Sequence, residues 1–313
     1  MEVQVKKMFW SVTAAAGVML FAAAITDGDR MDYRQLTPEE ENVLIDGGTE
    51  RPFAGIYVNT FEDGLYTCRQ CAAPLFRSEA KFQAHCGWPA FDTAIEGAVL
   101  SRLDADGERT EILCASCGGH LGHVFSGEGY TDTDTRHCVN SVSMDFIPAA
   151  RIETVYFAGG CFWGIEHAFD QTAGVLSARS GYMGGTTADP GYREVCSGAT
   201  GHAETVMVTY DSQAVSFRDL AVEFFEIHDP EQIDRQGFDT GTQYRSAIFY
   251  TTDEQLSVIR ELVQILLSRG YDIATEILPA GEFWEAEEYH QDYYDKNGAN
   301  GSCHVRVNRF SED

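Results

Sequence analysis

Two closely spaced cysteine pairs constrain the fold of this chain more than any other feature of its sequence. Cys68 and Cys71 form one pair, and Cys114 and Cys117 form the other. This spacing is typical of tetrahedral zinc sites, in which four thiolates close a structural centre. Two disulfides are the alternative in an exported protein. A structural metal suits a small domain, because its binding free energy becomes free energy of folding.

The N-terminus carries a pattern typical of a targeting segment. Two lysines precede a largely apolar run over residues 8–25, which is longer than most signal-peptide cores and short for a spanning helix. Ala22-Ala23-Ala24 could serve as a cleavage site, and a buried N-terminal helix is the alternative interpretation. We expect residues 1–30 to be a signal peptide or membrane anchor. The basic end would stay cytoplasmic, and residues 1–25 would deliver the chain to the periplasm or the outer face of the cytoplasmic membrane.

The balance of charge excludes one class of partner. The chain of 313 residues carries 22 basic and 49 acidic residues, a formal net charge of −27. Such a charge repels phosphate backbones and anionic lipid headgroups, so we expect no nucleic-acid partner. The length exceeds that of a usual single domain and favours two domains of roughly 100 to 200 residues each.

The residue pattern changes near residue 150, which predicts a domain boundary there. From residue 53 to 146 the chain reads as short, alternating, aromatic-rich segments broken by glycine and proline, a pattern typical of β-structure. Ahead of this region, Thr37-Pro38-Glu39-Glu40 is a capping box that predicts a short helix. After Arg151, a mixture of strand and helix patterns predicts an α+β fold.

The second half allows specific predictions of secondary structure. Residues 154–158 read as a buried strand, and residues 161–169 as the helix that follows it. Two more helices are predicted, one capped by Ser216 and one from Asp253 to a stop at Gly270. Further strands are expected over residues 204–210, 247–251 and 273–278.

Cys161 lies where a helix terminus favours an anion. It follows Gly159-Gly160 directly after the predicted strand and opens the predicted helix, so its sulfur meets unpaired amide groups and the positive end of the helix dipole. Phe162 and Trp163 offer an aromatic wall for a methyl or thioether group. We interpret Cys161 as a nucleophile; a buried structural cysteine is the alternative.

Cys138 is the second candidate thiol. Arg136 and His137 flank it, and cationic neighbours lower the pKa of a thiol. A cysteine in the core of a strand is the alternative. His120 and His123, beside the second cysteine pair, are candidate acid or base groups.

Ordered motifs in both halves carry a resemblance to known enzymes. The second half resembles the A-type methionine sulfoxide reductases through Gly160-Cys161-Phe162-Trp163, Gly201-His202-Ala203-Glu204, Phe238-Asp239-Thr240-Gly241-Thr242-Gln243-Tyr244-Arg245-Ser246 and Tyr289-His290-Gln291. The first half resembles the B-type enzymes through Thr49-Glu50-Arg51-Pro52-Phe53, Cys86-Gly87-Trp88-Pro89-Ala90-Phe91, Gly119-His120-Leu121-Gly122-His123-Val124-Phe125 and Arg136-His137-Cys138-Val139-Asn140-Ser141. The A-type enzymes act on the S epimer of methionine sulfoxide and the B-type enzymes on the R epimer.

The resemblance implies a domain order, a fold and a cofactor. A mainly-β, zinc-containing B-type domain is implied over residues 31–150. An α+β A-type domain, a ferredoxin-like α/β sandwich, is implied over residues 151–313. One structural zinc ion is expected on the four cysteines of the two close pairs, with no organic cofactor.

The resemblance also assigns roles to individual residues. In the A-type site, Cys161 is implied as the nucleophile and Glu204 as the proton donor. The other A-type residues implied are the polar groups Tyr192, Asp239 and Tyr244 and the methyl pocket of Phe162 and Trp163. In the B-type site, Cys138 is implied as the nucleophile. The residues implied around its substrate are Trp88, His120, His123, Arg136 and Asn140.

Two more cysteines are implied as resolving thiols, Cys86 in the B-type site and Cys303 in the A-type site. The segment around Cys303, residues 297–304, departs from the A-type pattern by an inserted residue and by a serine where an aromatic residue is expected. Cys196 is left over, and we expect it to be structural.

The reduction of a sulfoxide requires the same two chemical groups in each site. Reducing a sulfoxide needs a nucleophile for the sulfur and a proton for the departing oxygen. Glu204 must therefore be protonated at neutral pH, and we predict that an apolar pocket against Trp163 raises its pKa. His123 is the candidate acid of the other site. The attacking cysteine becomes a sulfenic acid, which condenses with a second thiol to give a disulfide.

We expect oxidised proteins or peptides as substrates and a thioredoxin-like or membrane-delivered dithiol as the reductant of the disulfide. A general thiol-disulfide oxidoreductase is the alternative enzyme, and it would need an exposed CxxC pair. For the first half, a zinc-stabilised binding module is the alternative, in which Cys138 would not react with an alkylating agent at neutral pH.

Overall fold

The computed structural model describes residues 33–104, 106–298 and 304–311. The expected leader over residues 1–30 and the candidate thiol Cys303 lie outside these ranges. Within them, no helix combines the length and the apolar character that crossing a membrane requires.

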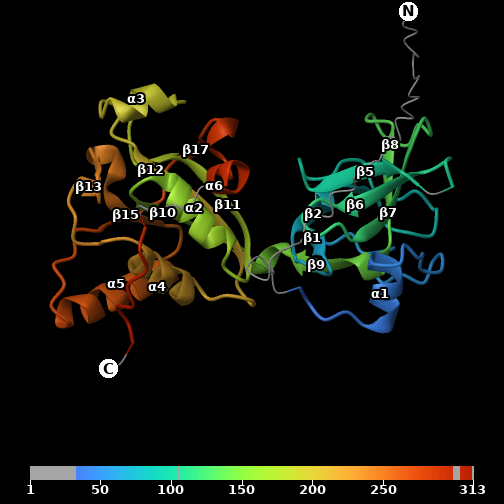
Figure 1. The fold of residues 1–313 in the computed structure, drawn as a ribbon, viewed down its shortest axis with the longest axis horizontal. Helices are drawn as coiled ribbons and strands as arrows, with labels where there is room; N and C mark the ends of the chain where they lie inside the picture. The colour runs from blue at the N-terminus through green and yellow to red at the C-terminus, as the bar shows by residue number, and fades with distance from the viewer. Residues whose placement is uncertain (1–32, 105, 299–303, 312–313) are drawn as a thin grey trace, which may run out of the picture. The chain divides into compact units, whose positions relative to one another are not determined.

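The first half is a short helix followed by two antiparallel sheets (Figure 1). The predicted capping box is present: the Thr37 hydroxyl accepts from the Glu40 N–H, and the Glu40 carboxylate accepts from the Thr37 N–H at 2.7 Å. The helices are α1 (Pro38–Leu44) and the 3-10 turns η1 (Ser78–Ala80), η2 (Ser141–Ser143) and η3 (Ala149–Arg151). The strands are β1 (Gly64–Cys68), β2 (Pro74–Arg77), β3 (Lys81–Phe82), β4 (Ala90–Phe91), β5 (Val99–Leu103), β6 (Thr110–Cys114), β7 (His120–Ser126), β8 (Thr135–Val139) and β9 (Met144–Pro148).

One core joins these two sheets. Strands β2, β1 and β9 form the smaller sheet, and β3, β4, β8, β7, β6 and β5 form the larger one in that order. Tyr66 from the smaller sheet meets Phe91 from the larger one edge to face, with ring centroids 4.9 Å apart, and Phe76 stacks on Phe91 at 4.4 Å. All three rings are fully buried, and such aromatic contacts add to the stability gained by burial. The first half is therefore mainly β, as its alternating pattern predicts.

The second half is built on one mixed sheet with strand order β16-β15-β10-β12-β11-β17 (Figure 1). Its strands are β10 (Ile152–Gly159), β11 (Val175–Met183), β12 (Ala203–Asp211), β15 (Ser246–Tyr250), β16 (Glu276–Pro279) and β17 (Trp284–Glu285), and β13 (Arg235–Gln236) pairs separately with β14 (Asp239–Thr240). Its helices are α2 (Phe162–Asp170), α3 (Tyr192–Cys196), α4 (Phe217–Ile227), α5 (Asp253–Ser268) and α6 (Tyr293–Asn297), with 3-10 turns η4 (Thr242–Tyr244) and η5 (Glu288–His290).

The centre of this sheet has the ferredoxin-like arrangement that the resemblance implies. In chain order it runs β10, α2, β11, β12, α4 and β15, and the four strands pair antiparallel in the order β15-β10-β12-β11. Phe157 of β10 stacks on Phe169 of α2 and on Phe224 of α4, both at 4.8 Å. The apolar faces of these helices therefore cover one face of the sheet and form the larger core.

The strands and helices predicted for the second half are present, although one strand begins late and several further elements, β11 the longest among them, were not predicted. The strand expected over residues 273–278 begins only at Glu276, because the Ala274 N–H donates to the Pro230 carbonyl at 2.8 Å instead of entering the sheet. Strand β11 was not predicted, although it pairs with β12 along nearly its whole length. The expected boundary at residue 150 falls within η3, and each sheet takes all its strands from one side of that turn.

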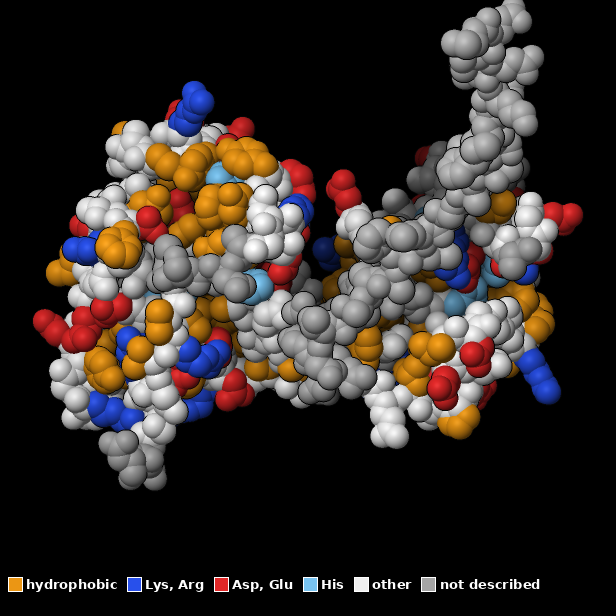
Figure 2. Space-filling view, viewed as in Figure 1, with side chains coloured by type: hydrophobic (Ala, Val, Ile, Leu, Met, Phe, Trp, Pro, Cys, Tyr) orange, Lys and Arg blue, Asp and Glu red, His pale blue; other side chains and the backbone are white. Residues whose placement is uncertain are grey.

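Figure 2 shows how charged side chains are distributed on one face of the described residues. On the face that Figure 2 shows, basic side chains stand singly or in small groups among acidic and apolar ones. That face of the described residues offers no continuous basic track for a phosphate backbone.

Candidate thiol sites

The four cysteines of the close pairs converge on one point. Their sulfur atoms all lie within 4.8 Å of one another; Cys68 is 3.6 Å from Cys117, and Cys71 is 3.6 Å from Cys114. Zinc–thiolate bonds of about 2.3 Å in a tetrahedron place sulfur atoms about 3.8 Å apart. Each pair stands at a strand end and the turn after it, and each turn closes with an N–H donated to the first cysteine's carbonyl at 2.9 Å. The donor set and its geometry fit a four-thiolate metal site.

The second feature of the first half is a pair of thiols in contact. Cys138 lies on β8, and Cys86 lies in the segment between β3 and β4. Their sulfur atoms are 3.7 Å apart, although 52 residues separate them along the chain. The structure therefore brings together the two thiols that the resemblance assigns to nucleophile and resolving roles.

Hydrogen bonding and charge act together on this pair. The hydrogen bond between the sulfurs lowers the pKa of one thiol of the pair, because the other thiol donates its proton to the sulfur that carries the charge. Arg136 is buried, its positive charge lowers the pKa of both thiols, and Glu128 holds it in place with bonds of 2.6 and 2.9 Å. The pair is thus built to carry one negative charge near neutral pH.

The expectation that His137 is a cationic neighbour of the thiol is wrong. Successive residues of a strand point to opposite faces, so His137 points away from the face that carries Cys138. Its Nδ1 lies 3.2 Å from the Phe91 carbonyl, and its ring contacts Phe76 in the core. Burial lowers its pKa, so the ring is neutral.

A bulge brings both candidate histidines to the same face as Cys138. Residues three apart on a regular strand face opposite sides, but β7 shifts register so that Leu121 is an extra residue between His120 and Gly122. The two imidazole centroids end 5.5 Å apart, and His123 pairs directly across from Cys138. The i, i+3 spacing therefore yields one cluster rather than two separate faces.

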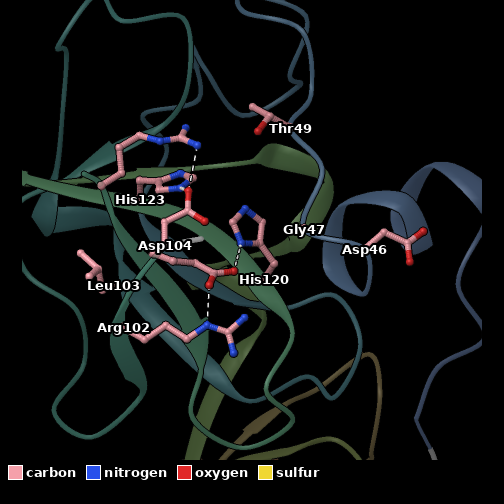
Figure 3. A pocket seen from close by; sticks show the side chains of 10 residues that line it. Asp46, Gly47, Thr49, Arg102, Leu103, Asp104, His120 and His123 are labelled. Atoms are coloured by element: carbon pink, nitrogen blue, oxygen red, sulfur yellow. Dashed lines mark hydrogen bonds and ion pairs between the residues drawn. The ribbon is translucent and has the colours of Figure 1, made fainter. Parts of the chain in front are cut away.

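Two adjoining cavities lie at this cluster. One of about 100 Å³ is lined by Thr49, Trp88, Arg109, Gly122, His123, Phe125, Cys138 and Asn140. The other, of about 510 Å³, shares Thr49, Arg109 and His123 with it and also contains His120 (Figure 3). Trp88, His123, Cys138 and Asn140 thus meet as predicted. Phe125, Thr49 and Arg109 were not predicted.

Asn140 and Trp88 also hold the site together. Asn140 is buried; its amide oxygen accepts from the Glu50 N–H at 3.1 Å, and its amide nitrogen donates to the Leu121 carbonyl at 3.0 Å. Trp88 donates to the Glu50 carbonyl at 3.1 Å. Both side chains therefore fix the segment around Glu50 against the sheet.

In the second half, Cys161 occupies the predicted position. It is the N-cap of α2, half-buried, and follows Gly160, whose φ of +100° suits glycine. A Cβ on Gly160 would come within 2.5 Å of Gln236, so the close approach of the backbone also requires glycine. The sulfur-bearing residue thus lies at the end of the helix where amide groups favour an anion.

Glu204 lies close to Cys161, because its carboxyl contacts the next residue along the chain. It is 1% exposed on β12, and its Oε2 accepts from the N–H of Phe162, the residue after Cys161, at 3.1 Å. Burial raises its pKa to about 8, the charge of Asp239 adds to the rise, and the Phe162 N–H opposes it. Glu204 is therefore protonated at neutral pH, as we predicted from the sequence.

Aromatic side chains line the region beside Cys161. Trp163 is half-buried, stacks on Tyr293 with centroids 3.6 Å apart, and donates to His290 Nδ1 at 3.1 Å. The ring of Phe162, 1% exposed, contacts the ring of His290 at 5.0 Å. Tyr293 and His290 are contributions that sequence reasoning missed; the Tyr289-His290-Gln291 motif was the available signal.

The predicted polar groups gather near Glu204. Burial raises the pKa of Tyr192, helped by a hydrogen bond with Cys196 and by the charge of Glu204. Burial and the same carboxyl raise the pKa of Tyr244. Both phenols remain protonated and can donate. Cys196, which we expected to be structural, is exposed and bonded to Tyr192.

Two family models and several known proteins match this chain. The family model described as "Peptide methionine sulfoxide reductase" matches residues 153–313, and the model described as "SelR domain" matches residues 36–148. Peptide methionine sulfoxide reductase MsrA of Deinococcus radiodurans is 49% identical over 159 residues, which cover 50% of this chain and 77% of that protein. MsrA of Acinetobacter baumannii strain AYE is 45% identical over 156 residues, 50% of this chain and 90% of that protein. The reduced form of Mxr1 from Saccharomyces cerevisiae matches 51% of this chain and 94% of its own, with 35% identity and a TM-score of 0.49.

The bulge in β7 predicts that Gly122 cannot be replaced by a larger residue without loss of stability. Its φ is +153°, and a Cβ there would lie 2.0 Å from the Cys138 carbonyl oxygen. We expect Gly122→Ala to lower the free energy of unfolding by roughly 3 kcal/mol, since the backbone of β8 must move. Gly127→Ala is the matched control, because Gly127 also has a positive φ but open space around it. The free energy of unfolding is measured in urea, with alkylation of Cys138 as the signal of unfolding. Equal losses of this free energy in the two variants would contradict the prediction.

Proposed function

Because the chain belongs to the peptide methionine sulfoxide reductase family and carries a SelR domain ahead of that region, we propose that it repairs oxidised methionine in proteins and peptides, reducing the S epimer at Cys161 and the R epimer at Cys138. The observation that carries the proposal is the buried, protonated carboxyl of Glu204 beside Cys161. A general thiol-disulfide oxidoreductase has no need of such an acid, whereas sulfoxide reduction must protonate the departing oxygen.

The reaction at Cys161 follows from these positions. The Cys161 sulfur attacks the sulfoxide, the sulfur–oxygen bond of the substrate breaks, and Glu204 gives its proton to the oxygen. The protonated oxygen becomes bonded to the Cys161 sulfur, which is oxidised to a sulfenic acid, and methionine leaves as the thioether, reduced by two electrons. Trp163 packs against the methyl group, and Tyr192 and Tyr244 donate to the polar oxygen.

A second thiol then attacks the sulfur of the sulfenic acid, the hydroxyl group leaves as water, and a disulfide forms. We assign this step to Cys303. Its neighbour along the chain, His304, places Nε2 2.9 Å from the Gly159 carbonyl, and a Cβ on Gly164 would collide with the same ring. The chain next to Cys303 is thereby anchored at the end of α2 that carries Cys161.

At the R-epimer site, Cys138 is the nucleophile and Cys86 the resolving thiol. Their separation of 3.7 Å means that Cys86 can attack a sulfenic acid on Cys138 after only a small rotation of its side chain. His123 supplies the proton, because it lines the same cavity as Cys138 and Trp88. An external dithiol reduces the disulfide at either site by exchange.

Loss of one thiol should abolish reduction of one epimer only. We expect Cys161→Ser to remove reduction of the S epimer of a methionine sulfoxide peptide and Cys138→Ser to remove that of the R epimer, because a serine hydroxyl is a far weaker nucleophile. Chiral chromatography of the products measures each rate, and Cys196→Ser, which keeps both proposed nucleophiles, is the control. Loss of both activities in one variant, or of neither, would favour the oxidoreductase alternative.

The raised pKa of Glu204 predicts the pH dependence of S-epimer reduction. The carboxyl keeps its proton below about pH 8 and loses it above, so the rate falls as the pH rises through about 8. Glu204→Gln should lower the single-turnover rate by about 100-fold and remove this fall of the rate with rising pH. Glu166→Gln is the control, because burial raises the pKa of Glu166 to about 7 but that carboxyl accepts from the Ser180 and Asp292 N–H groups instead. If the rate still falls near pH 8 in Glu204→Gln, or no longer falls there in Glu166→Gln, Glu204 is not the proton donor.

We also propose one zinc ion on Cys68, Cys71, Cys114 and Cys117. When bound, the metal supplies no chemistry to the substrate; it links the ends of β1 and β6 and so contributes to folding. The four convergent thiols fit this group better than two disulfides, because all four sulfurs lie close to one another rather than in two separate pairs.

Metal analysis checks the zinc proposal. We expect about one zinc per chain by elemental mass spectrometry, with loss of the metal and of R-epimer reduction in Cys117→Ser. The S-epimer rate should persist, since that site belongs to another sheet. A metal-free chain that still reduces the R epimer would contradict the proposal.

We further propose that residues 1–25 export or anchor the chain, so that the reductant is a thioredoxin-like or membrane-delivered dithiol outside the cytoplasm. The support is the apolar run and the need of both sites for an external dithiol. Catalytic turnover with a purified thioredoxin-like donor tests the reductant, and failure with every dithiol protein would count against it.

A further inference from the structure

Two carboxylates outside the assigned residues hold the histidines of the first site. Glu111 Oε1 lies 2.6 Å from His120 Nδ1, and Asp104 Oδ2 lies 3.0 Å from His123 Nε2 (Figure 3). A carboxylate bonded to one ring nitrogen sets the orientation of an imidazole and decides which nitrogen faces the other way. Each histidine is therefore fixed by an acid that lies 9 or 19 residues away along the chain.

Each of these carboxylates is in turn held by an arginine. Arg102 donates to Glu111 at 2.5 Å from the neighbouring strand β5, and Arg109 donates to Asp104 at 2.8 Å. Arginine in such a geometry is a rigid donor, so the acid cannot easily turn away from its histidine. The cluster is thus two series of hydrogen-bonded side chains, each running from an arginine through a carboxylate to a histidine (Figure 3).

The two histidines present different nitrogens to the cavities. His120 is bonded through Nδ1, and its buried Nε2 has no hydrogen-bond partner among the described residues. His123 is bonded through Nε2, so Nδ1 is the nitrogen left for a ligand beside Cys138. His123 alone of the two lines both cavities.

We propose that Asp104 is a positioning residue for the reaction at Cys138, and this rests on the proposed function of that site. Asp104 holds the Nε2 proton of His123, so Nδ1 faces the substrate. When both ring nitrogens carry protons, the one on Nδ1 passes to the sulfoxide oxygen as its bond to sulfur breaks. Cys138 then carries the oxygen as a sulfenic acid, and the thioether leaves. Without Asp104, the ring is free to rotate and the proton no longer points at the oxygen.

A neighbouring acid provides a matched control. Asp106 also bonds Arg109, with its Oδ2 2.5 Å from Nε, but it has no hydrogen bond to either histidine. Substitution of Asp106 therefore disturbs the same arginine and the same turn without releasing His123. A purely structural role of this turn would make Asp104 and Asp106 equivalent.

The test compares Asp104→Ala, Asp104→Asn and Asp106→Asn in the full chain, with an R-epimer methionine sulfoxide peptide and a dithiol donor. We expect Asp104→Ala to lower kcat by about 100-fold with KM changed less than about twofold, because proton transfer is lost and binding is kept. Asp104→Asn retains an oxygen that accepts from Nε2 and should restore most of the rate. Asp106→Asn and the S-epimer rate of every variant should match the unmodified chain.

The proposal is overturned if Asp104→Ala keeps its kcat, if only KM changes, if Asp104→Asn is as slow as Asp104→Ala, or if Asp106→Asn is equally slow. Failure of the proposed function looks different, because then the unmodified chain itself does not reduce the R epimer.

Discussion

Convergence of four sulfur atoms is the constraint on which the first half depends. Cys68 and Cys71 come from the end of β1 in the small sheet, and Cys114 and Cys117 from the end of β6 in the large one. A metal bound at this point, as we propose, would fix β6, and β6 sets the register of β7 and, through it, of β8. The row of Glu111, His123 and Cys138 across these strands then inherits its spacing from the cluster.

Both proposed sites need a reactive thiol and a proton donor, and the two halves provide them by different physical means. In the second half, burial of Glu204 keeps a carboxyl protonated beside Cys161, and the helix terminus favours the thiolate form of Cys161, the proposed nucleophile. In the first half, the sulfurs of Cys86 and Cys138 are in hydrogen-bond contact, and Asp104 orients His123, which pairs across from Cys138. The site at Cys161 depends on desolvation of an acid, and the site at Cys138 depends on the orientation of a histidine by a hydrogen bond.

Local features of this fold could be predicted from the sequence, and long-range ones could not. The capping box at Thr37 and the helix after Cys161 depend on neighbouring residues, so their patterns sufficed. The bulge that brings His120 and His123 to one face depends on pairing with β6, because residues three apart on a regular strand lie on opposite faces. The pairing of Asp104 with His123 arises only when β5, β6 and β7 align, which no local pattern records. His137 failed as a candidate because strand alternation turns it into the core.

The disulfide that forms in a single turnover distinguishes the two sites most directly. The reduced chain is mixed with one equivalent of an R- or S-epimer sulfoxide peptide, remaining thiols are alkylated, and the peptides are mapped by mass spectrometry. With the R epimer, we predict a bond between Cys86 and Cys138 and an alkylated Cys161. With the S epimer, we predict that Cys161 is in a disulfide while Cys86 and Cys138 are alkylated. The same disulfide with both epimers would contradict the assignment of two independent sites.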